Sequence, residues 1–175
     1  MKHKLPYDHV YPIAVAVLEL VRMNSERAEI AGSLRRKAQE VGDIEIVAAP
    51  KFYVPDMLGA PSETHSLDQF DWSTLGRVML NGHKQKKIIL PGEIQLDLFI
   101  VTPPAQWGVI FLLRTGSDSF NKRFVTKKSF GGLMPGHLKM KDGAIWQGSK
   151  LLPTPEEADM WKLWEMRPIP PWERK

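Results

Sequence analysis

Residues 31–47 read AGSLRRKAQEVGDIEIV, and this stretch decides the interpretation of the whole chain. A Gly-Ser pair and two arginines precede a second glycine, after which two acids alternate with isoleucines. In a strand, side chains two positions apart share a face, so Asp43 and Glu45 point the same way. The isoleucines next to them then enter the core. The stretch predicts a tight turn followed by a strand with two carboxylates on one face.

A third acid has the same setting further along the chain. Asp97 stands between two leucines in QLDLF. If the two strands pair, three carboxylates gather on one sheet face, and such hard oxygen ligands suit one or two Mg²⁺ ions, with Mn²⁺ as an alternative. Alternating acids also mark the solvent face of an ordinary strand, which is the other interpretation of each acid taken alone.

The glycine turn carries groups that bind phosphate. Gly32 allows the backbone to approach a ligand closely, and N–H groups at a turn or helix start bind phosphate oxygens. Ser33 adds a hydroxyl, and Arg35 or Arg36 adds a charged bidentate donor. Metal ligands together with a phosphate-binding turn are typical of a nucleoside triphosphate site.

The composition is that of an ordinary globular protein. The chain has 175 residues, 43% hydrophobic and 25% charged, and it has no cysteine. Disulfides, thiolate zinc sites and cysteine nucleophiles are therefore excluded. The apolar run IAVAVLELV is broken by Glu19 and is too short to span a bilayer, so we expect a soluble cytoplasmic protein.

Charge is unevenly distributed along the chain. The net charge is +4, and residues 114–175 hold 12 Lys+Arg against 7 Asp+Glu. A basic half favours a polyanion partner such as nucleic acid, because phosphate contacts release counterions. A solvated basic surface is the alternative.

Periodicity and turn signals predict a mixed α and β chain with an antiparallel component. The expected elements are a helix from Ile13 to the NSER cluster, a strand over ERAEI, a strand over DIEIVAA, a long loop over 50–76 with a short helix at SLDQF, a hairpin of RVMLN and KKIIL, a central strand over EIQLDLFIV, helices over AQWGVIFLLRTG and SFNKRFVTKKSF, a hairpin over HLKMKDGAIWQGSKLL and a last helix over PEEADMWKLWEM.

Two of these segments resemble a known family. GSLRRKAQEVGDIEIV resembles the nucleotidyltransferase signature of the X family of DNA polymerases, the group that contains polymerase beta. QLDLFIVTPPAQWGVIFLLRTGSDSFNKRF is similar to that family's third-carboxylate strand and to the Thr-Gly-Ser turn before its nucleotide-binding helix. The tail PIPPWERK is like the family's C-terminus. The resemblance covers about residues 10–49 and 77–175.

The resemblance implies a fold and a division of labour. We expect an α+β chain with a nucleotidyltransferase palm of mixed sheet and helices over residues 1–103. A small thumb-like α/β subdomain that binds nucleotide and DNA would follow over residues 104–175. No lyase domain or helix-hairpin-helix pattern is visible, so the chain is similar to the minimal members of the family.

The resemblance also implies residue roles. Asp43, Glu45 and Asp97 would be the catalytic metal ligands, with Asp97 beside the primer 3′-hydroxyl. The implied nucleotide-binding residues are Gly32, Ser33, Arg36 and Gly42 at the β and γ phosphates, Thr115 and Gly116 at the sugar, Asp118 at the base, and Asn121 at the minor-groove edge. Apart from the resemblance, the basic residues Arg123, Lys127 and Lys128 are expected DNA contacts; solvated surface lysines are the alternative for the last two.

The chain departs from the family pattern at three places. Glu45 replaces a second Asp, and the Leu113-Arg114 pair replaces an aromatic pair, so the family's selection of deoxyribose does not carry over. Val125 replaces the arginine that checks the template. We therefore expect low fidelity.

The expected function is short-gap DNA synthesis by a monomeric DNA polymerase that uses dNTPs, gapped or primed duplex DNA and Mg²⁺. Two alternatives remain open. One is nucleotidyl transfer to a small molecule, a protein or an untemplated 3′ end, and the other is a DNA-binding protein that has lost turnover.

Other conspicuous residues suggest structural roles. The histidines have no spacing typical of a zinc site, and the C-terminal tryptophans fit a core or tail anchor better than a base-stacking platform. These residues are His65, His83 and His137, and Trp161, Trp164 and Trp172.

Overall fold

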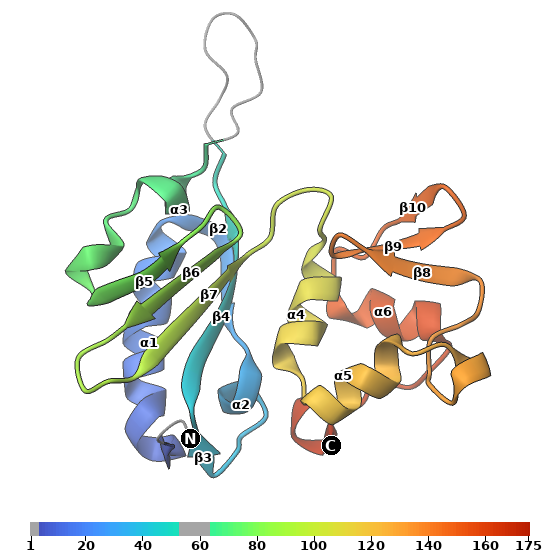
Figure 1. Cartoon of the computed structure of the whole chain (residues 1–175), viewed down its shortest axis with the longest axis horizontal. Helices are drawn as coiled ribbons and strands as arrows, with labels where there is room; N and C mark the ends of the chain where they lie inside the picture. Colours follow the sequence, from blue (N-terminus) through green and yellow to red (C-terminus); the bar gives the residue numbers. More distant parts are fainter. Residues whose placement is uncertain (1–3, 53–63) are drawn as a thin grey trace, which may run out of the picture. The chain divides into compact units, whose positions relative to one another are not determined.

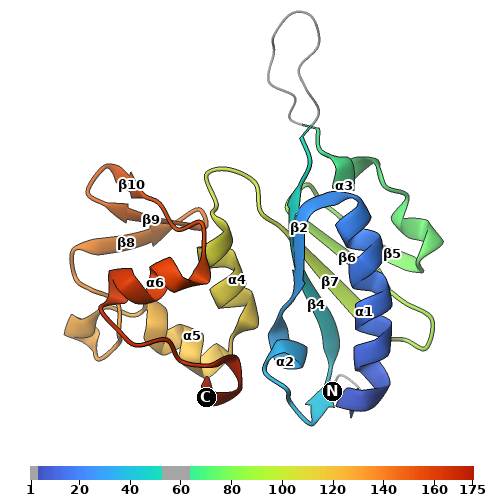
Figure 2. The ribbon, with the colours of Figure 1, turned by 180° about the vertical axis from the view of Figure 1, so that it is seen from behind.

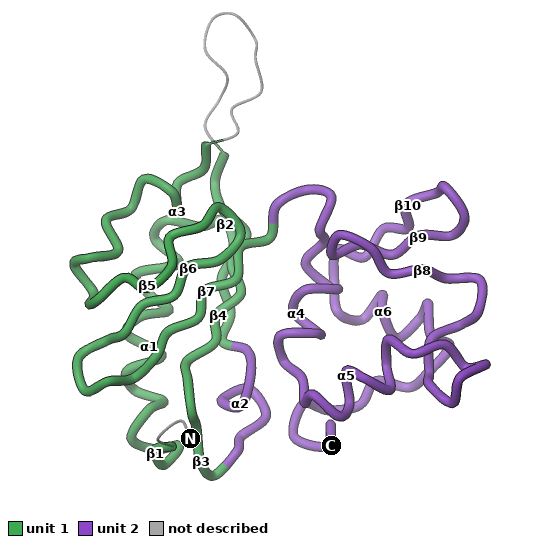
Figure 3. The backbone as a smooth tube through the Cα atoms, viewed as in Figure 1, with its two compact units in different colours: residues 1–30, 39–101 green, residues 31–38, 102–175 purple. Residues whose placement is uncertain are grey.

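The computed structural model describes residues 4–52 and 64–175, and it confirms a chain of mixed α and β structure (Figure 1). Two compact units divide the chain (Figure 3). Unit 1 comprises residues 1–30 and 39–101, and unit 2 comprises residues 31–38 and 102–175. The segment 31–38 therefore groups with the C-terminal part, a feature that the expected division at residue 103 did not include.

Unit 1 is built on a five-stranded sheet in the order β2-β4-β7-β6-β5. The strands β4 and β7 are parallel, and the other neighbouring pairs are antiparallel. Because β7 is the middle strand, the expected central position of EIQLDLFIV is confirmed. The strands are β2 Ser25–Ile30, β4 Asp43–Pro50, β5 Arg77–Asn81, β6 Gln85–Ile89 and β7 Gln95–Ile100, and a separate short ladder pairs β1 Leu5–Pro6 with β3 Glu40–Val41.

The helix α1, Tyr7–Met23, covers one face of this sheet (Figure 2). Its buried residues recur every three or four positions from Val10 to Val21, which is the spacing of one helical face. The expectation that the helix starts after Pro12 is wrong, because Pro12 lies inside it. Pro12 has no N–H to donate to the Asp8 carbonyl, so one helical hydrogen bond is missing. The missing bond lies close to the N-terminus of the helix, where the first N–H groups have no helical acceptor in any case.

The segment between β4 and β5 includes two short helical elements. They are α3 Ser66–Gln69 and the 3-10 turn η1 Trp72–Thr74. The short helix expected at SLDQF is thus confirmed, whereas the part of the expected loop at 53–63 lies outside the described residues. Trp72 is buried and its indole N–H donates to the Leu67 carbonyl at 2.8 Å.

Unit 2 combines helices with a small antiparallel sheet of order β10-β9-β8. Its elements are α2 Gly32–Arg35, α4 Trp107–Thr115, α5 Asp118–Val125, η2 Lys128–Phe130, β8 Leu138–Lys141, β9 Ala144–Gln147, β10 Lys150–Leu152, α6 Glu157–Trp164 and η3 Pro171–Glu173. The expected C-terminal hairpin has a third strand, β10. The expected helix over 119–130 ends at Val125, because Thr126 is extended and Lys127 bridges to Met134.

Aromatic rings dominate the core of unit 2. Trp164 is completely buried, stacks on Phe124 at 4.6 Å between ring centroids and donates its indole N–H to the Phe124 carbonyl. Trp161 packs edge-on against the same phenylalanine. The core role expected for these two tryptophans is confirmed. Trp172 is 55% exposed and is not part of this core.

Within residues 4–52 and 64–175, no helix combines the length and the apolar composition that a membrane crossing requires.

Candidate active site

The three predicted carboxylates lie on the two adjacent parallel strands at the middle of the unit 1 sheet. Glu45 is the register partner of Asp97, and Asp43 pairs with Gln95 two positions earlier. Register partners in neighbouring strands point to the same face, as do residues two apart in one strand. The expected pairing of the two strands is confirmed, and all three acids share one face of the sheet.

The alternate residues of the same strands form the apolar face. Ile44, Ile46, Leu96 and Leu98 are completely buried. Their burial fixes the register, because a slip of one residue would turn the acids inward and the apolar side chains outward. The alternation seen in the sequence is therefore what orients the carboxylates.

The Asp97 side chain is fixed by a hydrogen bond to one oxygen, while its other oxygen has no hydrogen-bond partner among the described residues. It is 7% exposed, and the Gln95 side-chain amide donates to its Oδ2 at 2.5 Å. Lys87, its partner on β6, has its Nζ 3.6 Å from Oδ1, an ion-pair separation too long for a hydrogen bond. Oδ1 is buried and has no hydrogen-bond partner among the described residues. Buried carboxylate oxygens without a partner are uncommon and call for a ligand or another cause.

This donor set fits a hard divalent cation. Asp43 and Glu45, on the face that Asp97 shares, are partly exposed. Three carboxylates supply only oxygen donors, which Mg²⁺ and Mn²⁺ prefer. Lys87 offsets part of their combined negative charge in the absence of an ion. The buried Oδ1 atom of Asp97, which accepts no hydrogen bond from the described residues, is the observation that supports this fit.

In unit 2, the predicted phosphate-binding residues begin the short helix α2. Gly32 has a φ of 59°, a left-handed conformation that favours glycine. The Ser33 hydroxyl is buried and has no hydrogen-bond partner among the described residues. Gly42, the other predicted glycine, lies in unit 1 between β3 and β4.

The two arginines of α2 bind the end of α4. Arg36 donates through Nη1 to the Thr115 carbonyl, and Arg35 donates to the Thr115 hydroxyl at 2.6 Å. The next residue, Gly116, has a φ of 71°, and a Cβ there would lie 2.9 Å from Arg36 Nη1. Glycine at 116 therefore leaves room for the guanidinium. Two motifs separated by 79 residues meet within unit 2.

A buried glutamate fixes Arg35 from the other side. Arg35 Nη2 lies 2.5 Å from Glu157 Oε2, and its guanidinium lies 3.9 Å from the ring centroid of Phe111. Arg174 of the C-terminal tail pairs with the other oxygen of Glu157. The tail, α6 and α2 are thus joined through one carboxylate, a connection that the sequence did not reveal.

The helices α4 and α5 line a groove of about 400 Å³. The predicted base contacts Asp118 and Asn121 line it, and so do Leu113, Arg114 and Val125, which are among the positions that depart from the family pattern. The Asn121 amide donates to the Leu113 carbonyl at 2.7 Å. Its Oδ1 is buried without a hydrogen-bond partner among the described residues.

The predicted DNA contacts lie in a basic segment of unit 2. Residues 119–141 contain six Lys+Arg and no Asp or Glu. Arg123 and Lys128 are exposed, whereas Lys127 is partly buried. Phe130 is 80% exposed at the end of η2, next to these lysines. An exposed aromatic ring among cations is typical of surfaces that contact nucleic acid bases.

A second polar cluster, in unit 1, was not predicted from the sequence. The structure brings His65 and His83 together with Asp68, although their spacing in the chain gave no such signal. Burial holds the pKa of His65 below its ordinary value, against the opposite effects of its hydrogen bond to the His83 carbonyl and of Asp68. Burial also opposes ionisation of Asp68, but hydrogen bonds from Lys86 and His83 outweigh it and lower the pKa of this carboxyl. His137 lies in unit 2 and is exposed.

Gln95 and Lys87 were also missed as neighbours of Asp97. A signal for Gln95 was present, because it stands two positions before Asp97 on the same strand face. Lys87 could be found only once the register of β6 against β7 was known.

Comparisons with known proteins add no family assignment. The chain matches no protein-family model, and no curated protein matches it.

Proposed function

We propose that the protein is a nucleotidyltransferase that extends a DNA primer from dNTPs, with the chemistry of the X family of DNA polymerases. The observation that carries the proposal is the register of Glu45 opposite Asp97, with a buried Asp97 oxygen that has no hydrogen bond among the described residues, on the same sheet face as Asp43. If the acids had only a structural role, burying a carboxylate oxygen without a hydrogen bond would cost stability and bring no benefit.

The carboxylates have defined tasks in this proposal. Asp43 and Glu45 would ligate both ions of a two-metal site, and Asp97 would ligate the ion beside the primer hydroxyl. Mg²⁺ bound there would supply Lewis acidity, which lowers the pKa of the hydroxyl and offsets phosphate charge. Gln95 orients Asp97 through its hydrogen bond to Oδ2.

Residues of unit 2 would hold the nucleotide. Ser33 has an unused hydroxyl and Arg36 a guanidinium, and these groups suit the oxygens of the β and γ phosphates. Thr115 and Gly116 would border the sugar. Asp118 and Asn121 line the groove between α4 and α5, where the base would bind, and the free Asn121 acceptor would contact its edge.

The basic segment 119–141 would contact the DNA backbone, principally through Arg123, Lys127 and Lys128. Such contacts make binding depend strongly on salt, because each neutralised phosphate releases counterions. The groove also lacks the family's template-checking arginine, since Val125 lines it instead. Low-fidelity filling of short gaps is the activity that these features favour.

Primer extension tests the proposal directly. Purified protein is incubated with Mg²⁺ or Mn²⁺ and each dNTP on a one-nucleotide gap, a recessed primer and a single-stranded primer. We expect template-matched addition, strongest on the gap, that is lost in Asp97→Asn and kept in Asp142→Asn, an exposed aspartate in the β8–β9 turn. No incorporation on any substrate by the folded wild-type protein would overturn the proposal.

A second candidate is untemplated or non-DNA nucleotidyl transfer. Val125 and the Leu113-Arg114 pair favour it, because these groove positions lack the family's contacts to template and sugar. Addition of all four nucleotides to the single-stranded primer, independent of any template, would support this candidate over templated synthesis.

A further inference from the structure

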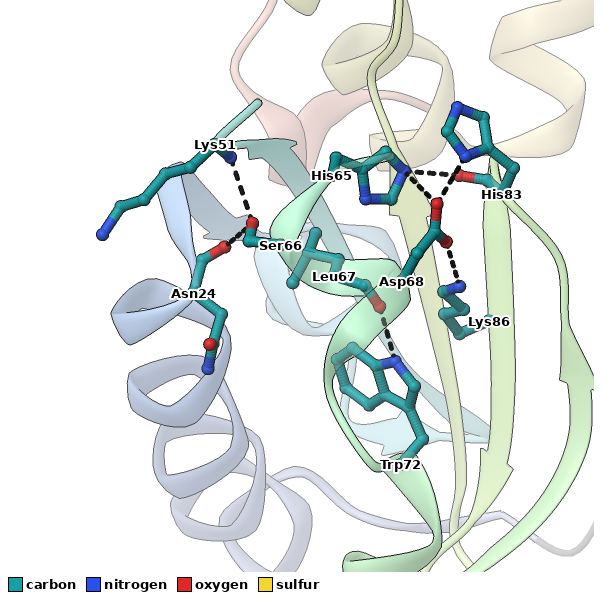
Figure 4. Close-up of polar contacts among 9 residues, drawn as sticks. All are labelled: Asn24, Lys51, His65, Ser66, Leu67, Asp68, Trp72, His83 and Lys86. Atoms are coloured by element: carbon teal, nitrogen blue, oxygen red, sulfur yellow. Dashed lines mark hydrogen bonds and ion pairs between the residues drawn. The ribbon is translucent and has the colours of Figure 1, made fainter. Parts of the chain in front are cut away.

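A second group of metal-ligand side chains lies where α3 meets the β5–β6 turn of unit 1 (Figure 4). His65 immediately precedes α3, Asp68 lies within it, and His83 lies in the turn. Figure 4 shows the three side chains pointing toward one another. One ligand atom from each residue lies within 4.8 Å of the other two, so a single ion could contact all three.

The separations suit a small tetrahedral ion. Zinc bonds to nitrogen and carboxylate oxygen of about 2.0–2.1 Å place neighbouring tetrahedral ligand atoms roughly 3.3–3.4 Å apart. His65 Nε2 and Asp68 Oδ2 are already 3.3 Å apart. His83 Nδ1 is closer to Oδ2, at 2.5 Å, and its side chain is 43% exposed, so the ring has room to move back.

Lys86 holds the carboxylate so that one oxygen stays directed at the histidines. Its Nζ lies 2.6 Å from Asp68 Oδ1, while both imidazoles approach Oδ2. Metal-binding carboxylates are commonly fixed in this way by an outer hydrogen bond. Lys86 is 1% exposed, and its buried position keeps the ammonium on the far oxygen.

The rings themselves are well positioned. His65 is completely buried, its backbone bridges to Phe52, and its ring lies 4.3 Å from the ring of His83. His65 Nε2 donates a hydrogen bond to the His83 carbonyl at 3.0 Å, so without an ion the ring carries its proton on Nε2. His65 Nδ1 has no hydrogen-bond partner among the described residues, so zinc binding at Nε2 would move the ring proton to Nδ1 and displace the contact with the His83 carbonyl.

We propose that His65, Asp68 and His83 bind one Zn²⁺ ion. Two imidazole nitrogens and one carboxylate oxygen favour zinc over the oxygen-seeking Mg²⁺. Three protein ligands leave one coordination position for water. The ion would join α3 to the β5–β6 turn and stabilise unit 1, because it binds only the folded arrangement. The proposal is independent of the nucleotidyl transfer proposed above.

Zinc titration of the untagged full chain tests this site. The protein is first stripped with a chelator, and excess Mg²⁺ is then added to occupy the oxygen-only carboxylates. We expect one Zn²⁺ per chain by competition with a chromophoric chelator. Co²⁺, used as a spectroscopic probe, should give the intense visible absorption of a four-coordinate site.

Two variants make the assignment specific. His83→Gln removes a partly exposed ligand. Because losing an outer hydrogen-bond partner already weakens metal binding by roughly 10- to 100-fold, losing a ligand should weaken zinc binding by about 100-fold or more. His137→Gln removes an exposed histidine of unit 2 and should bind as the wild type does. Asp68→Asn, which preserves side-chain shape, serves as the second ligand variant if His83→Gln does not fold. Absence of stoichiometric binding, or equal binding by folded ligand variants and wild type, would overturn the proposal.

Discussion

Two neighbouring lysines of β6 contact two different aspartates of unit 1. Lys86 Nζ lies 2.6 Å from Asp68 and is completely buried, whereas Lys87 Nζ stays 3.6 Å from Asp97 on the other face of the strand. Asp68 has hydrogen-bonding partners on both oxygens, while Oδ1 of Asp97 has none among the described residues. The direct contact with Lys86 occupies one oxygen of Asp68, whereas the longer contact with Lys87 leaves Oδ1 of Asp97 without a hydrogen bond from the described residues.

The donor atoms around the two aspartates differ as well. The face of Asp97 offers carboxylate oxygens, from Asp43 and Glu45, and Asp68 is surrounded by two imidazoles. Hard cations prefer the first set and zinc the second. Unit 1 thus presents two kinds of candidate ion site, and each should respond to a different metal.

The largest expected effect separates the two aspartates by function. Asp97→Asn should reduce nucleotide incorporation on the order of 10³-fold or more, equivalent to about 4 kcal/mol of barrier. It should leave zinc binding and folding unchanged, because Asp68 is untouched. Asp68→Asn should weaken zinc binding and leave nucleotide incorporation unchanged. Rates and zinc affinity of both variants, with circular dichroism as the folding control, check this; equal incorporation by wild type and Asp97→Asn would remove the proposed role of the carboxylate.

Heat stability should distinguish the ions. Zn²⁺ at about 100 times its dissociation constant stabilises a protein by about 2.7 kcal/mol, which raises the Tm of a chain of this size on the order of 5–10 °C. We expect this shift in wild type and His137→Gln and not in His83→Gln, by differential scanning calorimetry. Mg²⁺ should give the same small change in all three proteins. A zinc shift that persists in His83→Gln would place the ion elsewhere.

The longer lysine contact should tune the metal requirement. Lys87→Met removes a cation beside Asp97, and one charge at this range is worth about 1 kcal/mol in water, or roughly a fivefold change in affinity. The Mg²⁺ concentration for half-maximal incorporation should therefore fall by about fivefold. Lys84→Met, an exposed neighbour in the preceding turn, is the matched control. An unchanged or higher requirement in Lys87→Met would show that the lysine does not compete with the ion.

The smallest expected effect is on acid stability. The pKa of His65 is held below the ordinary 6.5, so folding disfavours its protonation. The corresponding stability is present above the unfolded pKa and is lost as pH falls from about 6.5 toward the folded pKa. In chelator, the Tm of wild type should decline from pH 7 to 5, and His65→Gln should decline less steeply. Parallel profiles for the two proteins would assign the acid sensitivity to other groups.

The parts of the fold that could be predicted are those that local alternation determines. Ile44, Ile46, Leu96 and Leu98 alternate with acids, so one sequence pattern gave the strands, their buried face and the carboxylate face together. The predicted start of α1 was wrong, because a proline near a helix end costs only one hydrogen bond. The packing of the apolar face of the helix offsets that cost.

The remaining features depend on contacts between distant segments. His65 and His83 meet only because α3 packs beside the β5–β6 turn, and no period in the sequence encodes that contact. The link from Arg35 through Glu157 to Arg174 likewise joins three separate segments. Pairing of β10 with β9 was missed because a strand of three residues carries almost no periodic signal.

The assignment of residues 31–38 to unit 2 has a consequence for how the chain could be divided. The polypeptide leaves unit 1 after Ile30, returns at Gln39 and leaves again after Val101. A single cut in the gene therefore cannot yield unit 2 whole: a fragment ending at residue 101 would contain all of unit 1 but would also carry α2 without α4, and its complement would lack the arginines that bind Thr115. Unit 2 therefore could not be exchanged between proteins as one continuous segment of the chain.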